Sequence, residues 1–279
     1  MPEKSLVVDL HCHSTASDGT LAPSDVVRRA AQLGVNVLAL TDHDSTAGLD
    51  EAHRQAIESG LRLIPGLEVS TTWQGKLLHV VGLGVDPESP GLRQGLARLQ
   101  AMRDRRASDM GTSLAKAGFS NAESAARKLA GEGMVTRTHY ARYLVEAGAA
   151  KDMKQVFKRY LVRGKPGYVK VDWVDISEAI DWIRQAGGVA VLAHPLRYKL
   201  TANWLNRVLT AFREHGGTGL EVVCGNHSAD DNYRAALFAS KHGLQASAGS
   251  DFHEPGPWIE LGKLASMPDD MQPVWHRWQ

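Results

Sequence analysis

The chain has 279 residues, of which 43% are hydrophobic and 23% charged, and its 32 Lys+Arg against 31 Asp+Glu leave a formal net charge of +1. This composition is typical of a soluble globular protein and excludes a disordered, fibrous or coiled-coil chain. No apolar run approaches the roughly 20 residues that a bilayer requires, and the first residues lack the apolar core of a signal peptide, so we expect a cytoplasmic protein without membrane association.

Strands alternate with helices along most of the chain. Short apolar runs predict seven strands, at residues 5–11, 35–43, 61–70, 76–84, 188–194, 218–223 and 244–251. Apolar residues at helical spacing predict helices over 23–33, after the second strand through Ile57, and over 176–185, 204–214 and 230–242. Residues 88–170 show helical patterns and no convincing strand.

This order of elements predicts an α/β fold. A mainly parallel sheet, either open or closed into a barrel, would be covered on its outside by helices. We expect residues 1–87 and 171–279 to form this core, and residues 88–170 to form a helical insertion.

The charges are segregated along the chain. Residues 91–170 contain 17 Lys+Arg and 6 Asp+Glu, a net of +11, so the remainder carries 15 − 25 = −10. A basic stretch commonly forms solvated helix faces. Here the acidic remainder includes metal-ligand candidates, so the two parts are also candidates for the halves of one anion-binding site.

Side chains that bind metals accompany the predicted strands. These residues are His11, His13, His43, Glu68, His79, His194, Asp251 and His253. Active sites of α/β barrels and open sheets lie at the carboxyl ends of the strands, so we expect these side chains to converge. Imidazoles and carboxylates suit Zn, Mn or Fe, and Glu68 could bridge two ions.

The remaining histidines and the cysteines carry less information. His53, His215, His242 and His276 lie in or beside helical stretches without ligand-type neighbours. Cys12 would point away from the flanking histidines in an extended segment, so we interpret it as a packed thiol. Cys12 and Cys224 are too few for a disulfide framework.

Four separated motifs resemble those of the PHP superfamily, the polymerase and histidinol phosphatase phosphoesterases. They are DLHCHSTASDG (9–19), LTDHD (40–44), AHP (193–195) and GSDFH (249–253). The segments GLEVSTTW, KLLHVVGLG, TRTHYARYLVEAG, KPGYV and PGPWIELG are similar to the bacterial branch with the nucleoside 3′,5′-bisphosphate phosphatases and the 5′–3′ exoribonuclease called RNase AM.

The resemblance implies a distorted seven-stranded α/β barrel that holds three divalent metal ions. It places His11, His13, Glu68 and Asp251 on the first ion, Glu68, His79 and His194 on the second, and Asp18, His43 and His253 on the third. Asp18 stands where some relatives have histidine. This oxygen ligand favours Mn²⁺ or Fe²⁺ over Zn²⁺, and we expect Mn²⁺.

The expected chemistry is hydrolysis of a phosphoester. Two ions bridged by Glu68 would activate water and neutralise phosphate oxygens, so no protein nucleophile is needed. The ion held by Asp18, His43 and His253 would bind the phosphate or stabilise the alkoxide that leaves. The general acid is not identifiable from the sequence, and Asp42 is either an orienting residue or a turn residue.

Substrate selection is expected to come from the basic insertion. Arg103 and Arg106 share a helical face, while Arg137 and His139 begin a second helix, and together they could hold a 5′-phosphate. Arg105, Arg142, Lys158 and Lys165 are weaker candidates. His227, after the sixth strand, is either a contact to the sugar or base or a loop residue without such a role.

The favoured activity is hydrolysis of the 3′-phosphoester of a 5′-phosphorylated nucleotide. A terminal 3′-phosphate gives bisphosphate phosphatase activity, and a 3′-phosphate that leads to another nucleotide gives 5′–3′ exonuclease activity on short RNA. The alternatives are histidinol-phosphate phosphatase and a non-catalytic, metal-stabilised PHP module. We infer no obligate protein partner, and the sequence leaves base preference and oligomeric state open.

Overall fold

Seven strands form the framework of the molecule. The structure is a computed structural model that describes residues 6–268 and 270–278. The seven strands are β1 (Val8–Asp9), β2 (Val37–Leu40), β3 (Arg62–Trp73), β4 (Lys76–Leu83), β6 (Val189–Leu192), β7 (Gly219–Cys224) and β8 (Gln245–Gly249). They pair in the order β1-β2-β3-β4-β6-β7-β8, and each lies where the sequence predicts a strand.

The sheet curls until its first and last strands meet. The amide of Leu10 donates to the carbonyl of Ala248 at 2.9 Å, and the amide of Asp251 donates to the carbonyl of His11 at 2.7 Å. The predicted seven-stranded α/β barrel is therefore confirmed, in the nearly closed form. Closure brings the segments that follow β1 and β8 side by side.

One strand runs against its neighbours. β4 is antiparallel to both β3 and β6, whereas the other neighbouring pairs in the barrel order are parallel. The reason is local, because Gln74 and Gly75 (φ 47° and 73°) form a two-residue turn that reverses the chain directly. The amino-terminal half of β4 consequently lies at the same end of the barrel as the carboxyl ends of the parallel strands.

A short additional strand was not predicted. β5 (Val174–Asp175) pairs in parallel with Thr71 and Thr72 of β3, outside the order of the other seven strands. A two-residue strand carries no alternation of apolar and polar residues, so the sequence has no periodic signal for it.

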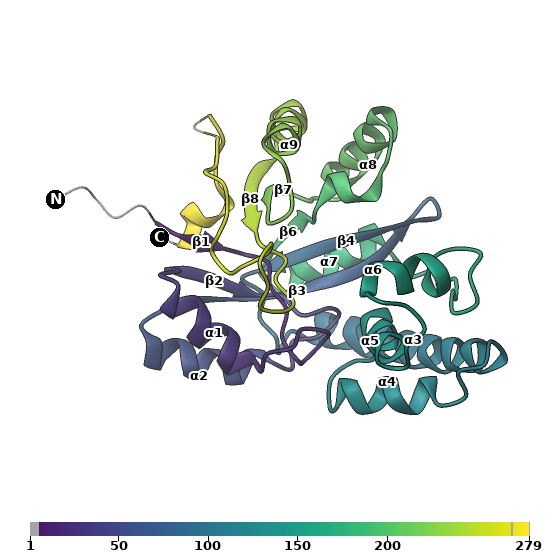
Figure 1. The fold of residues 1–279 in the computed structure, drawn as a ribbon. Helices are drawn as coiled ribbons and strands as arrows, with labels where there is room; N and C mark the ends of the chain where they lie inside the picture. Colours follow the sequence, from purple (N-terminus) through teal and green to yellow (C-terminus); the bar gives the residue numbers. More distant parts are fainter. Residues whose placement is uncertain (1–5, 269, 279) are drawn as a thin grey trace.

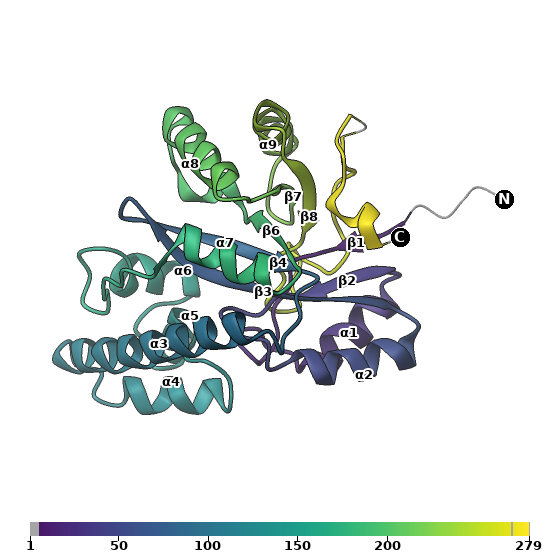
Figure 2. The same ribbon diagram turned by 180° about the vertical axis from the view of Figure 1, so that it is seen from behind.

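Helices cover the outside of the barrel (Figures 1 and 2). They are α1 (Pro23–Gln32), α2 (Leu49–Ser59), α7 (Ile176–Gln185), α8 (Ala202–Glu214) and α9 (Ala229–His242). Their apolar faces pack on strands whose side chains are buried on both sides. The predicted helices agree with these bounds to within two residues at the ends that the sequence defined.

The helices between β4 and β5 form a separate group at one side (Figure 1). They are α3 (Pro90–Lys116), α4 (Ala122–Ala130), α5 (Arg137–Glu146) and α6 (Met153–Val156), which continues into a π-helical turn over Phe157–Leu161. Met110, Leu114, Tyr140 and Leu144 belong to their own apolar core. The first half of α3 instead packs on the barrel core through Leu92, Leu96 and Leu99.

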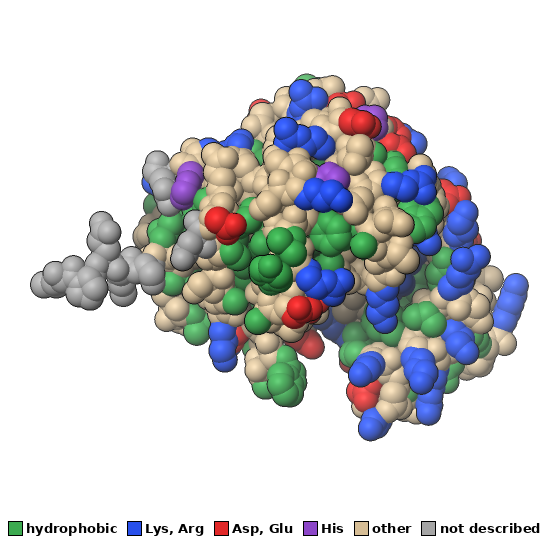
Figure 3. Space-filling model, turned by 90° about the horizontal axis from the view of Figure 1, so that it is seen from above, with side chains coloured by type: hydrophobic (Ala, Val, Ile, Leu, Met, Phe, Trp, Pro, Cys, Tyr) green, Lys and Arg blue, Asp and Glu red, His purple; other side chains and the backbone are tan. Residues whose placement is uncertain are grey.

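The basic charge of this segment divides into two sets. Thirteen of its 17 Lys+Arg are exposed, including Arg105, Lys158 and Lys165, as expected for solvated helix faces. Figure 3 shows many Lys and Arg side chains on the right, where Figure 1 places these helices. The other four are buried or half-buried, namely Arg103, Arg106, Arg137 and Arg142.

Two further expectations concern the thiols and the membrane. The Cys12 thiol is fully buried in the apolar cluster beneath α1 and α2, and its Sγ lies 3.2 Å from the carbonyl of Ala39, as predicted for a packed residue. Among the described residues, every helix is too short or too polar to cross a bilayer.

Gly249 ends β8 where only a hydrogen side chain fits. A Cβ there would lie 2.2 Å from His11 Cβ and 2.6 Å from Glu221 Oε1. We predict that Gly249→Ala lowers the free energy of unfolding by about 1 to 3 kcal/mol, because two buried segments must move apart. Urea unfolding measures this change. Gly256→Ala is the control, since its Cβ meets only Glu254 O at 3.9 Å, and a loss as large as that at Gly249 would contradict the steric explanation.

Candidate metal centre

Nine ligand-type side chains meet at one end of the barrel. They are the predicted set His11, His13, Asp18, His43, Glu68, His79, His194, Asp251 and His253, and they fall into four overlapping groups that could each hold a metal ion. His79 reaches the cluster from the amino-terminal half of antiparallel β4, not from the carboxyl end of a parallel strand. Convergence therefore occurs as predicted, although the direction of one strand differs from the expected pattern.

Glu68 lies at the centre of the cluster. Its Oε1 is 2.9 Å from His79 Nδ1 and 3.0 Å from His194 Nε2, and its Oε2 is 2.8 Å from His43 Nδ1. His11 Nε2 and His13 Nε2 lie 3.4 and 3.5 Å from the same carboxylate. A carboxylate with histidines on both oxygens has the arrangement of a ligand that bridges two ions.

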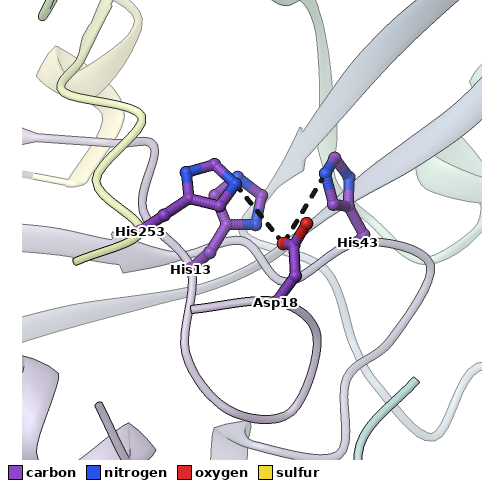
Figure 4. A group of neighbouring side chains, drawn as sticks. All are labelled: His13, Asp18, His43 and His253. Atoms are coloured by element: carbon purple, nitrogen blue, oxygen red, sulfur yellow. Dashed lines mark ion pairs between the residues drawn. The ribbon is translucent and has the colours of Figure 1, made fainter. Parts of the chain in front are cut away.

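Asp18 forms a second group of possible metal ligands with His13, His43 and His253 (Figure 4). Its Oδ1 is 3.3 Å from His253 Nε2 and 3.9 Å from His43 Nε2, the two contacts drawn in the figure. Asp251 provides a third carboxylate, whose Oδ1 is 3.1 Å from His13 Nε2 and 3.4 Å from His11 Nε2. Arg197 forms an ion pair with the other oxygen of Asp251.

The donor atoms fit divalent metal ions. Asp18 Oδ1 and Glu68 Oε2 are buried, and although histidine nitrogens lie near both, neither oxygen accepts a well-directed hydrogen bond, which is costly unless a cation satisfies them. Burial by itself would raise the pKa of Glu68, but the imidazoles of His79, His43 and His11 outweigh burial and hold this pKa well below its usual range. Burial, with the charges of His253 and His43, lowers the pKa of His13 to about 3, which leaves its ring neutral and able to coordinate.

The backbone adopts unusual conformations beside these side chains. His194 and Asp251 have φ values of 29° and 56°, and Asp44, directly after His43, has 47°. Non-glycine residues with positive φ are uncommon, and such conformations concentrate at functional sites where surrounding contacts hold them. At His194 the amide donates to Glu221 Oε2 at 2.6 Å, and this hydrogen bond fixes the turn at the end of β6.

Glu221 is a supporting residue that the sequence analysis missed. It is buried in β7, its Oε1 accepts a hydrogen bond from His11 Nδ1 at 2.9 Å, and its Oε2 holds the amide of His194. Because a carboxylate only accepts, the proton of His11 must be on Nδ1, and Nε2 is free to coordinate. Its charge inside an otherwise apolar predicted strand was the one signal of this role.

Asp42 resolves the choice that the sequence left open. Its carboxylate accepts hydrogen bonds from the amide and hydroxyl of Ser14, at 2.7 and 2.6 Å, and from the hydroxyl of Ser17 at 2.6 Å. It therefore orients the loop between His13 and Asp18, and not His43, its neighbour in the chain.

A cavity of about 220 Å³ lies between the metal cluster and the insertion. Asp18, His43, His79, His194, Asp251 and His253 line one side of it, and Arg103, Arg106, Arg137, Thr138, Phe157 and Trp173 line the other. Figure 3 shows a deep notch in this face of the molecule. A larger cavity of about 820 Å³, near Glu51, Asp104 and Glu132, is lined by none of the nine predicted ligands.

The arginines of the cavity are not equivalent. Arg103 is buried and paired, since its Nε donates to Asp44 Oδ2 at 2.6 Å and its Nη2 donates to Ser70 Oγ at 2.8 Å. Arg106 and Arg137 have no carboxylate within ion-pair distance among the described residues. Burial, followed by the charges of Arg137 and Arg103, lowers the pKa of Arg106 to about 9. An anion between these guanidinium groups would relieve their repulsion.

The two other predicted substrate residues do not line this cavity. His139 Nδ1 accepts the amide of Thr136 at 3.0 Å and caps α5, and burial lowers its pKa to about 4. His227 lies in the loop after β7, and neither ring nitrogen has a hydrogen-bond partner. The geometry gives no support for assigning substrate contacts to these two histidines.

Comparison with known protein families matches residues 9–188 to the PHP domain. The chain belongs to the PHP family. A 5′–3′ exoribonuclease of Haemophilus influenzae is 48% identical over 269 residues, which are 96% of this chain and 98% of that protein. A 3′,5′-nucleoside bisphosphate phosphatase of Chromobacterium violaceum is 46% identical over 270 residues, which are 96% and 95% of the two chains. This PHP protein is thus closely related to hydrolases of phosphoester bonds.

Solved structures agree with this relationship. A Chromobacterium violaceum protein described as an amidohydrolase, with bound sulfate and no metal, has a TM-score of 0.93 and 45% identity, and the match covers 97% of this chain and 95% of the other. A Bifidobacterium adolescentis protein described as a metal-dependent phosphoesterase has a TM-score of 0.78 and 27% identity, with 97% and 94% covered. The family relationship and the donor clusters both point to divalent metal ions.

We predict that Glu221→Gln weakens metal binding about 10- to 100-fold, the usual effect of losing a residue that orients ligands. Glutamine keeps one accepting oxygen, so it can hold either His11 Nδ1 or the His194 amide, but not both. Competition with a chelator, followed by elemental analysis, measures the change. Glu58→Gln on the exposed face of α2 is the control, and equal metal affinity of both variants would contradict the role of Glu221.

Proposed function

We propose that this PHP protein hydrolyses the 3′-phosphoester of 5′-phosphorylated nucleotides. The observation that carries the proposal is the cavity lined on one side by six of the nine clustered metal-ligand candidates and on the other by Arg106 and Arg137, which have no ion-pair partner among the described residues. Such a cavity suits a substrate with two phosphate groups, one to be cleaved and one to be held.

The proposal includes three divalent metal ions, with Mn²⁺ favoured over Fe²⁺ or Zn²⁺. His11, His13, Glu68 and Asp251 would hold the first, Glu68, His79 and His194 the second, and Asp18, His43 and His253 the third. When bound, such ions supply Lewis acidity and positive charge for phosphoester hydrolysis. The neutral imidazole of His13 and the low pKa of Glu68 support this assignment, because both side chains are in their coordinating forms.

The side chains of the centre have distinct tasks in this proposal. Glu68 holds the middle of the cluster, so a change there would disturb two ions. Asp18, His43 and His253 border the side of the cavity that faces the insertion. We propose that they, with the ion they would hold, bind the phosphate that is cleaved and stabilise the 3′ oxygen that leaves.

Arg106 and Arg137 would bind the terminal 5′-phosphate. Both guanidinium groups lie over aromatic rings, Arg106 at 5.6 Å from the centre of the Trp173 ring and Arg137 at 5.8 Å from that of Phe157. Stacking restricts each guanidinium plane and leaves its edge for a phosphate. Arg103, already bonded to Asp44, would add charge to this wall of the cavity.

One geometry would give both activities named for the relatives. A nucleoside 3′,5′-bisphosphate would lose its terminal 3′-phosphate, as the name of the Chromobacterium violaceum relative describes. A short 5′-phosphorylated RNA would release its first nucleotide, as the name of the Haemophilus influenzae relative describes. In both cases, the same contact with the 5′-phosphate would determine which phosphoester lies at the metal centre.

The alternatives explain fewer observations. Histidinol phosphate has a single phosphate, which gives no reason for two half-buried arginines without an ion-pair partner opposite the cluster. A metal-stabilised module without activity predicts lost ligands, whereas all nine candidate positions carry ligand-type side chains.

Hydrolysis of adenosine 3′,5′-bisphosphate and of a 5′-phosphorylated RNA pentamer tests the proposal. We expect AMP and phosphate from the first substrate and stepwise release of 5′-mononucleotides from the second, with 5′-hydroxyl RNA and adenosine 3′-monophosphate reacting much more slowly. Product analysis by chromatography distinguishes these outcomes. Equal rates with and without the 5′-phosphate would refute the proposal that the enzyme holds the 5′-phosphate and cleaves on the 3′ side.

Arg137→Gln separates binding from chemistry. We expect kcat/KM on a 5′-phosphorylated substrate to fall roughly ten- to a hundredfold, because a charge-assisted contact of about 1.5 to 3 kcal/mol is lost. Hydrolysis of a small aryl phosphate should change far less. Arg163→Gln, the same charge change at an exposed position of the insertion, is the matched control. An equal loss on both substrates would place Arg137 in the catalytic centre instead.

A further inference from the structure

The first turn of α5 contacts both the metal centre and the side of the cavity that carries Arg103, Arg106 and Arg137, called the arginine wall below. Arg137 begins this helix and lines the cavity, and the residues on either side of it, Thr136 and Thr138, bond to Asp18. Thr136 Oγ1 and Thr138 Oγ1 donate to Asp18 Oδ2 at 3.1 and 2.8 Å. Three consecutive residues therefore connect a metal-ligand candidate to a phosphate-binding candidate.

These contacts leave the two oxygens of Asp18 in different environments. Oδ2 accepts both hydroxyl groups from the insertion, whereas Oδ1 is buried, has no hydrogen-bond partner, and lies near His253 and His43. A carboxylate held by one oxygen has its other oxygen aimed in a defined direction. The direction of Oδ1 into the metal centre is therefore set by α5, which belongs to the insertion.

The insertion holds the backbone of the same loop. Arg142, one turn later in α5, donates from Nη2 to the carbonyl of Asp18 at 2.9 Å. Gly133 approaches so closely that a Cβ there would lie 2.2 Å from Thr15 O. These contacts tie the loop that carries Asp18 to α5 and to the segment before it.

An anion in the cavity would affect the position of this turn. Arg103, Arg106 and Arg137 form one ion pair among them, between Arg103 and Asp44, and their like charges repel one another, although the charge of Asp18 attracts Arg137. A phosphate between the guanidinium groups removes this repulsion. It would thereby favour the position of α5 in which Thr136 and Thr138 reach Asp18.

We propose that binding of the 5′-phosphate and binding of the metal ion at Asp18, His43 and His253 are positively coupled through Thr136 and Thr138. The inference rests on the proposed function, since it assigns the 5′-phosphate to Arg106 and Arg137. Coupling of two binding equilibria is reciprocal, so each ligand raises the affinity of the other by the same factor. The two threonines are positioning residues that act through Asp18.

The test measures binding without turnover, with Mn²⁺ and AMP as the probes. AMP has the 5′-phosphate but no 3′-phosphoester, and adenosine is the matched control without phosphate. In the wild-type protein, AMP should tighten one Mn²⁺ site per chain by about fivefold or more, and Mn²⁺ should tighten AMP binding by the same factor. Electron paramagnetic resonance of free Mn²⁺ and calorimetry give the two measurements.

Two variants of Thr138 separate coupling from folding. Thr138→Val removes the hydroxyl with little change of shape, and the coupling factor should fall below about twofold while AMP binding to the metal-free protein is retained. Thr138→Ser keeps the hydroxyl and should keep the coupling. Retained AMP binding shows that the arginine wall of the valine variant is intact.

The possible results are distinct. Full coupling in Thr138→Val overturns the inference, because AMP would then act directly on the metal ions. AMP binding without any coupling in the wild-type protein also overturns it, but leaves the 5′-phosphate site in place. If AMP binds no better than adenosine under either condition, the proposed phosphate site itself is wrong, and the coupling fails with it.

Discussion

The structure depends on the burial of Glu68 among histidines at one end of the barrel. A carboxylate with about 1% of its side chain exposed is stable only if cations or donors surround it, and five imidazoles lie within 3.5 Å of its oxygens. Those imidazoles come from the segments that follow three different strands, β1, β2 and β6, and from antiparallel β4, so the closed barrel is what brings them together. The positive φ values at His194 and Asp251 are tolerated because the amide of His194 donates to Glu221 and the amide of Asp251 donates to the carbonyl of His11, which holds both turns.

A second constraint comes from the arginines that face this cluster. Guanidinium groups that are partly withdrawn from water without a carboxylate partner are unfavourable, and the half-buried Arg106 and Arg137 are in this state, over the rings of Trp173 and Phe157. One side of the cavity is therefore rich in metal-coordinating groups that call for cations, and the other is rich in positive charge that calls for an anion. A phosphorylated substrate with metal ions would satisfy both walls. In the proposed function, this complementarity joins the barrel and the insertion into one site.

Local patterns in the sequence predict correctly what short-range spacing encodes. The apolar runs locate all seven strands of the barrel order. The four motifs contain seven of the nine ligand-type side chains that converge, and the segments GLEVSTTW and KLLHVVGLG contain the other two, Glu68 and His79. The same patterns carry no information where the outcome depends on distant partners. Glu221 has no motif, and its role exists only because His11 and the amide of His194 lie beside it. The capping bond of His139, whose Nδ1 accepts the amide of Thr136, likewise has no signal in the sequence, and a contact of His139 with substrate stays a prediction.

By itself, the sequence determined the alternation of strands and helices, the ligand-type residues at the strand ends, and the basic character of residues 91–170. These are properties of composition and short-range spacing, which survive without knowledge of the fold. Only the tertiary structure decided which four of the 17 basic residues face the barrel, that β4 runs antiparallel, and that Thr136 and Thr138 hold Asp18. Each of these depends on contacts between segments far apart in the chain. Such contacts are selected by the packing of whole elements, and no local pattern records them.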